Sequence, residues 1–245
     1  MKIQRRHLGG LTTLLALGAL LGPGCAENQS SLFVRGAMLV PSDTCEVSAD
    51  ASATLIFRGV LDLAFTTEYR GVLLVGNQMV RRGNSASLRT ETSRVSFESA
   101  DVRILDAAGN ELGAFSAPAS GFVDPSTGTE PGYGTVSVVM VDSGSAAGAV
   151  GGADGGSRTP VEVVANVIVR GTTLGGEEIA TGEWQFPIDV CRGCLVFFPG
   201  EADDPLVPGT DCSIRDDAPS LCRVGLDSPV DCRFCSGSNS ICDAP

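Results

Sequence analysis

Nine cysteines are the residues of this chain best suited to chemistry, and most of them lie toward its C-terminal end. They are Cys25, Cys45, Cys191, Cys194, Cys212, Cys222, Cys232, Cys235 and Cys242. Two C-x2-C pairs, Cys191 with Cys194 and Cys232 with Cys235, could together supply the four thiolates of a structural zinc site. The 37 residues between the pairs exceed the roughly 15–20 that are usual for such sites. A redox-active C-x-x-C is a further interpretation, but no thioredoxin-like βαβ pattern surrounds either pair.

Structural disulfides are the interpretation that the cysteine count favours. An odd number of cysteines in an exported protein leaves one without a partner, so a separate use for Cys25 would let the other eight pair. Seven cysteines lie from Cys191 onward and cannot all pair among themselves, so if all are oxidised within one chain, Cys45 must bond to one of them. A bridge from Cys45 to Cys191 would close a loop of about 150 residues and stabilise the fold by roughly 4–5 kcal/mol. The pairs that we predict are Cys45–Cys191, Cys194–Cys212, Cys222–Cys232 and Cys235–Cys242.

The first 24 residues have the features of an export signal. Lys2, Arg5 and Arg6 give a positive start, and residues 11–22 are mostly apolar. That stretch is too short to span a bilayer, which takes about 20 apolar residues. A short basic segment, a short apolar segment and small residues before a cleavage point are typical of a secretory signal peptide. We therefore predict that residues 1–24 are removed.

The sequence LLGPGC at residues 20–25 resembles the lipobox of bacterial lipoproteins, with the small residue Gly24 directly before Cys25. Where that family favours leucine, three places before the cysteine, this chain has Gly22. The resemblance implies lipidation of Cys25, a tether over residues 25–31, and a membrane as the partner that holds the protein. With Ala26 next, it also implies sorting to the outer membrane. The mature part is similar to cysteine-rich lipoproteins of the cell envelope.

Composition excludes several classes of function for the mature chain. Without residues 1–24 it has 14 basic and 29 acidic residues, a net charge of −15, so neither nucleic acid nor anionic lipid is an expected partner. The only histidine, His7, and the only lysine, Lys2, leave with the signal. Their loss excludes a Ser-His-Asp relay, histidine-bound metal and a Schiff-base lysine. We predict no catalytic residue, no cofactor and no metal site.

The segments that must position the cysteines have the patterns of β-strands. Apolar and polar residues alternate at Val95, Phe97, Val102 and Ile104, and residues 135–142 are rich in β-branched side chains. Residues 160–171 and 177–191 form a predicted hairpin across the glycines of residues 174–176. The Gly/Ala/Ser-rich residues 143–157 are predicted to form a flexible surface loop, and no stretch has a convincing helical period.

About eight strands of this kind, separated by short turns, favour an all-β antiparallel β-sandwich over residues 32–198, with an immunoglobulin- or fibronectin-like pattern. Residues 199–245 have many prolines and cysteines and few large apolar residues, so disulfides rather than a core would hold this irregular tail.

Three functions remain compatible with the sequence. The first is a non-enzymatic, lipid-anchored envelope protein with a structural role or a role in binding another envelope protein. The second is a carboxylate-based enzyme acting on glycans, or a glycan-binding module, although aromatic residues for stacking are few. The third is a zinc-binding, cysteine-rich tail. The first is our prediction, because the residue types needed for catalysis are missing.

Overall fold

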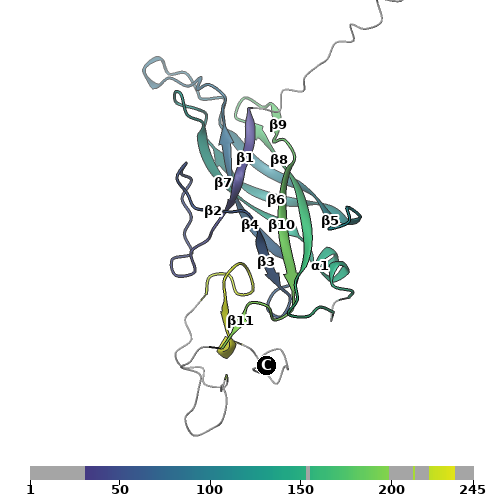
Figure 1. Ribbon diagram of the computed structural model, residues 1–245. Helices are drawn as coiled ribbons and strands as arrows, with labels where there is room; N and C mark the ends of the chain where they lie inside the picture. Colours follow the sequence, from purple (N-terminus) through teal and green to yellow (C-terminus); the bar gives the residue numbers. More distant parts are fainter. Residues whose placement is uncertain (1–30, 153–154, 199–211, 213–220, 235–245) are drawn as a thin grey trace, which may run out of the picture.

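The computed structural model describes residues 31–152, 155–198, 212 and 221–234 (Figure 1). Strands make up most of the regular structure, in line with the β-like patterns of the sequence. Their bounds are β1 Leu32–Met38, β2 Leu55–Ile56, β3 Gly59–Asp62, β4 Tyr69–Asn77, β5 Val95–Asp106, β6 Glu111–Val123, β7 Gly132–Val141, β8 Val161–Thr173, β9 Glu178–Ala180, β10 Trp184–Cys191, β11 Val196–Phe197 and β12 Val230–Asp231.

Ten of these strands form one continuous sheet that curls into a nearly closed cylinder (Figure 1). The strand order is β2-β1-β4-β7-β6-β5-β8-β10-β3, and β9 pairs with β8 off this path. The two edge strands, β2 and β3, are consecutive in the chain, with only Phe57 and Arg58 between them. The covalent chain therefore draws the two edges of the sheet toward each other.

The all-β class and the disulfides toward the C-terminus are confirmed, whereas the arrangement differs from two separate layers of a sandwich. Strand β6 pairs with β5 along its length and with β7 at Ser120 and Ser137, so it joins the two halves of the sheet. A β-bulge between Phe97 and Ser99 lets the long strand β5 bend around the core. The edge strand β3 also departs from the antiparallel pattern, because it runs parallel to β10.

The core fills the inside of the curled sheet and follows the period of two that the sequence shows. On β8 the inward residues are Val163, Ala165, Val167 and Val169, and all four are fully buried. Strands β5 and β7 contribute alternating apolar residues to the same cluster, which also contains Phe186. Small and β-branched side chains suit this tightly curved interior.

Residues 143–157 contain a short helix where we predicted a flexible loop, so that prediction is wrong. Helix α1 spans Ser143–Ala149, and the Asp142 side chain caps it by accepting hydrogen bonds from the backbone of Gly144 and Ser145. Ala146 is fully buried. The helix lies close to strand β6 at Gly113, where a Cβ would be only 2.3 Å from the Oγ of Ser145.

In the part of the chain that the structure describes, no helix has the length and apolar character needed to cross a bilayer.

Candidate functional site

The disulfides gather at the end of the cylinder where β10 ends and the C-terminal segment returns to it. The structure forms Cys45–Cys222, Cys191–Cys194 and Cys212–Cys232, with sequence separations of 177, 3 and 20 residues. The predicted pairs Cys45–Cys191, Cys194–Cys212 and Cys222–Cys232 are therefore wrong, although Cys45 does bond to the C-terminal region. The predicted pair Cys235–Cys242 and the predicted lipidation site Cys25 lie outside the described residues.

A tight turn explains why Cys191 bonds to its neighbour in the chain rather than to Cys45. Gly193 has a positive φ of 83°, a conformation that glycine adopts without steric cost, and the turn brings the Cα atoms of Cys191 and Cys194 to 5.9 Å. The two cysteines thus satisfy each other locally. The bonds of Cys191 with Cys194 and of Cys232 with Cys212 also use three of the four thiolates that a zinc site would need.

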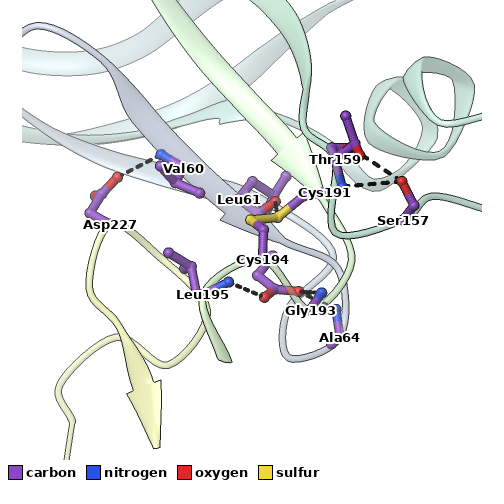
Figure 2. Close-up of a disulfide and its surroundings, with 11 residues drawn as sticks. Val60, Leu61, Ala64, Ser157, Thr159, Cys191, Gly193, Cys194, Leu195 and Asp227 are labelled. Carbon is purple, nitrogen blue, oxygen red and sulfur yellow. Dashed lines mark hydrogen bonds between the residues drawn. A yellow bond between two sulfur atoms is a disulfide. The ribbon is translucent and has the colours of Figure 1, made fainter. Parts of the chain in front are cut away.

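A buried carboxylate braces this turn from inside. Asp62, the last residue of β3, is fully buried. It accepts hydrogen bonds from the backbone N–H groups of Gly193 at 2.6 Å, Leu195 at 3.0 Å and Ala64 at 3.0 Å. Figure 2 shows these three residues beside the Cys191–Cys194 disulfide. The ligand atoms of Asp62, Cys191 and Cys194 lie within 4.8 Å of one another, but the two sulfurs are bonded together. The cluster is thus arranged as a structural brace.

A second buried acid attaches the C-terminal segment to the wall of the cylinder. The hydroxyl of Tyr69, a fully buried residue of β4, donates to the carboxylate of Asp227 at 3.0 Å. The backbone N–H of Val60 donates to the same carboxylate at 2.9 Å. An Nη1 atom of Arg223 lies 3.6 Å from Asp227, and its guanidinium lies 5.8 Å from the centre of the Tyr69 ring.

Burial sets the protonation behaviour of this pair. Desolvation raises the pKa of Asp227 above its ordinary value, although the Val60 N–H, Arg223 and Tyr69 act in the opposite direction. Desolvation, together with the nearby Asp227 charge, also raises the pKa of Tyr69. Tyr69 therefore remains a hydrogen-bond donor at neutral pH.

We call residues 221–234 the clasp. This segment contacts β3, and two disulfides join it to Cys45 and Cys212. Leu226 forms a β-bridge with Leu61, and the carbonyl of Gly225 accepts a hydrogen bond from the N–H of Asp62. Strand β12 pairs with β11 in parallel. The clasp covers the outer edge of β3, which would otherwise present unpaired backbone groups. Part of the predicted irregular tail thus completes the cylinder.

A carboxylate-based, glycan-active site would have to use acids such as those exposed on the outer face of the sheet. Asp101 pairs with Arg170 at 2.6 Å, and Glu183 pairs with Arg103 at 3.2 Å, in shallow grooves over β5 and β8. The side chains of both acids are more than two-fifths exposed. Glycoside hydrolysis uses two carboxyl groups that flank the scissile bond, whereas these two acids are each held by an arginine on an open surface. This surface therefore gives no support to a hydrolytic site.

Sequence reasoning identified the cysteines but missed Asp62, Tyr69 and Asp227. A signal existed for Asp62, which is a lone acid inside the apolar stretch VLDLAF at residues 60–65. For Tyr69 and Asp227 no local pattern could have shown the contact, because 158 residues separate them. No protein-family model matches this chain, and a comparison with the curated proteins finds none similar to it.

Proposed function

We propose that this protein is a non-enzymatic, lipid-anchored component of the bacterial cell envelope, held at the outer membrane through Cys25, with a structural or protein-binding role. The proposal begins from the resemblance of residues 20–25 to a lipobox. The three disulfides support export, because such bonds persist in oxidising compartments such as the periplasm and are rare in the cytosol.

The observation that carries the proposal is the Cys45–Cys222 disulfide. It links the segment after β1 to the clasp across 177 residues, so it fixes both ends of the described chain to one cylinder. A covalently closed β domain of this kind suits a rigid module that must persist outside the cytosol without chaperones or reducing agents. The buried acids support the same interpretation, because Asp62 and Asp227 are engaged by backbone groups and by Tyr69.

Lipid labelling tests the anchor directly. Cells that express the full-length protein and are fed radiolabelled palmitate should label the wild type and leave Cys25→Ala unlabelled. We expect the wild type in the outer-membrane fraction and Cys25→Ala in the soluble fraction, because the acyl chains supply the membrane affinity.

Ser30→Ala, in the predicted tether, is the matched control and should behave like the wild type. The proposal is wrong if Cys25→Ala stays membrane-bound, or if the wild type carries no label.

A further inference from the structure

One end of the cylinder differs from the rest of the molecule in charge and exposure. It is formed by residues 78–94, 124–131 and 174–177, which we call the rim. Asn77, at the end of β4, pairs with Leu32 at the start of β1 and with Gly132 at the start of β7. The N–H of Leu174 donates to the carbonyl of Arg94 at 2.8 Å. The three connections therefore lie together at the end where the described chain begins (Figure 1).

The longest connection of the rim is basic in an acidic protein. Residues 78–94 carry four of the 14 basic residues of the mature chain and one acid, Glu91. The rest of the mature chain has ten basic and 28 acidic residues, a net charge of −18. The other two connections of the rim add three acids, Asp124, Glu130 and Glu177, and no basic residue. The positive charge is therefore confined to residues 78–94, where the cluster of arginines favours an anionic surface.

Large apolar side chains are exposed on the same rim. Leu88 is 91% exposed and Val80 is 77% exposed, both within residues 78–94. Leu174, also in the rim, and Phe122, near the end of β6 beside the rim, are each more than half exposed. Apolar residues beside arginines are the combination that binds the interface between lipid headgroups and acyl chains.

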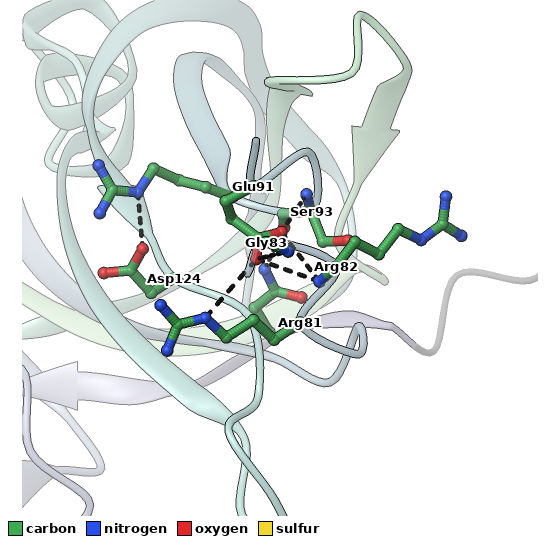
Figure 3. Close-up of polar contacts among 8 residues, drawn as sticks. Arg81, Arg82, Gly83, Glu91, Ser93 and Asp124 are labelled. Atoms are coloured by element: carbon green, nitrogen blue, oxygen red, sulfur yellow. Dashed lines mark hydrogen bonds and ion pairs between the residues drawn. The ribbon is translucent and has the colours of Figure 1, made fainter. Parts of the chain in front are cut away.

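Glu91 is the single acid of this loop, and its side chain is only 20% exposed. Its carboxylate accepts hydrogen bonds from the backbone N–H groups of Ser93 at 2.7 Å, Gly83 at 2.8 Å and Arg82 at 3.1 Å (Figure 3). Burial alone would raise the pKa of Glu91, but these N–H groups together lower it, so the brace persists over the physiological pH range.

Two arginines of the loop are left for an external partner. Arg94 pairs with Asp124 at 2.6 Å, and Arg81 lies 3.9 Å from Glu91. In the described part of the chain neither Arg82 nor Arg89 forms an ion pair. Figure 3 shows the Arg82 side chain extending away from the Glu91 cluster.

We propose that the rim docks onto the bilayer surface, with Leu88 and Val80 entering the headgroup region and Arg82 and Arg89 contacting anionic phospholipid headgroups. This inference rests on the proposed lipid anchor. From Cys25 to Ser31 the chain can extend over at most about 20 Å, because a residue spans no more than ~3.6 Å. An anchored protein would therefore hold the rim within reach of the membrane.

Fluorescence quenching tests the docking on the acylated, full mature protein. We would reconstitute Leu88→Trp into vesicles that contain phosphatidylglycerol and lipids with brominated acyl chains, and subtract the signal of Trp184 measured in the wild type. The matched control is Phe57→Trp, because Phe57 is 87% exposed and lies between β2 and β3, away from the rim. We expect the bromines to quench the added indole in Leu88→Trp and not in Phe57→Trp.

The second part of the test is whether docking depends on the charges of the two arginines. Arg82→Gln with Arg89→Gln, in the Leu88→Trp background, should lower the docking equilibrium about fivefold per arginine in phosphatidylglycerol vesicles. In pure phosphatidylcholine the two arginines should make no difference. Equal quenching at both indole positions, or quenching that is independent of the arginines, would overturn the docking.

The same samples separate the two proposals. An acylated Leu88→Trp protein that stays in the vesicles but is not quenched contradicts the docking and leaves the anchor standing; this is also the outcome expected if the rim binds a protein instead. A mature protein that carries no acyl chain contradicts the proposed function, and the docking fails with it.

Discussion

Two acids in the clasp, only four residues apart, have pKa values that their surroundings shift in opposite directions. Asp227 is raised in pKa by burial, and its main partners are the neutral Tyr69 hydroxyl and the Val60 N–H. Asp231 is lowered in pKa, chiefly because the Arg233 side chain donates to it at 2.9 Å. The same residue type therefore contributes to stability with opposite pH dependence in one short segment.

We predict that the contribution of Asp227 falls as the pH rises. A carboxyl with a raised pKa binds its proton more tightly in the folded state, so its stabilising effect is present in acid and is lost as the pH rises through the folded pKa. The unfolding free energy of the wild type minus that of Asp227→Asn should therefore decrease from about pH 3 to about pH 6, around the ordinary carboxyl range. Urea unfolding followed by Trp184 fluorescence measures it.

Asp231→Asn is the control for that experiment, with the reverse sign. A carboxyl with a lowered pKa stabilises the fold above its unfolded pKa and loses that effect as the pH falls, so the corresponding difference should increase over the same pH range. If both variants show the same sign, our account of the clasp is contradicted.

Strand β6 is the element on which the continuity of the sheet depends. It pairs with β5 over most of its length but meets β7 at a single pair of residues, Ser120 and Ser137. Next to that pair, Gly121 has a φ of +146°, and a Cβ there would lie 2.3 Å from the carbonyl oxygen of Thr135 on β7. The two halves of the sheet can approach so closely because this residue is glycine.

Gly121→Ala should therefore weaken the junction between β6 and β7. The variant combines an unfavourable φ with a backbone clash, and we expect it to lower the free energy of unfolding by about 3 kcal/mol. Gly109→Ala is the control, because Gly109 also has a positive φ of 85° but has open space around it. That variant should cost only about 1 kcal/mol. Equal losses in urea unfolding would show that close packing at the junction is unimportant.

Two features close the whole molecule: the curled sheet and the disulfide bonds. The sheet brings its edge strands β2 and β3 together through a two-residue connection, and the clasp then covers β3. Cys45–Cys222 secures this arrangement across 177 residues, whereas Cys191–Cys194 closes only a tight turn. The two bonds should therefore differ greatly in what they contribute to stability.

We predict that removing the long-range bond is the more destabilising change. In the chain-entropy model, a loop of this length contributes about 5 kcal/mol and the short Cys191–Cys194 loop about 2 kcal/mol. Cys45→Ser with Cys222→Ser should accordingly lower the free energy of unfolding by about 3 kcal/mol more than Cys191→Ser with Cys194→Ser. A larger loss in the second pair, measured in urea, would mean that the brace by Asp62 outweighs the entropy of the long loop.

Local pattern in the sequence determined the β class, the approximate positions of strands β5, β7, β8 and β10, and the need for Cys45 to bond to the C-terminal region. Those conclusions depend on side-chain alternation and on counting, which the sequence alone supplies. Tertiary structure decided the curled sheet, the helix at Ser143–Ala149 and the disulfide partners. It also decided the pairing of Tyr69 with Asp227. These features depend on which distant segments become neighbours, and burial between such neighbours overrides the weak local preference of small residues.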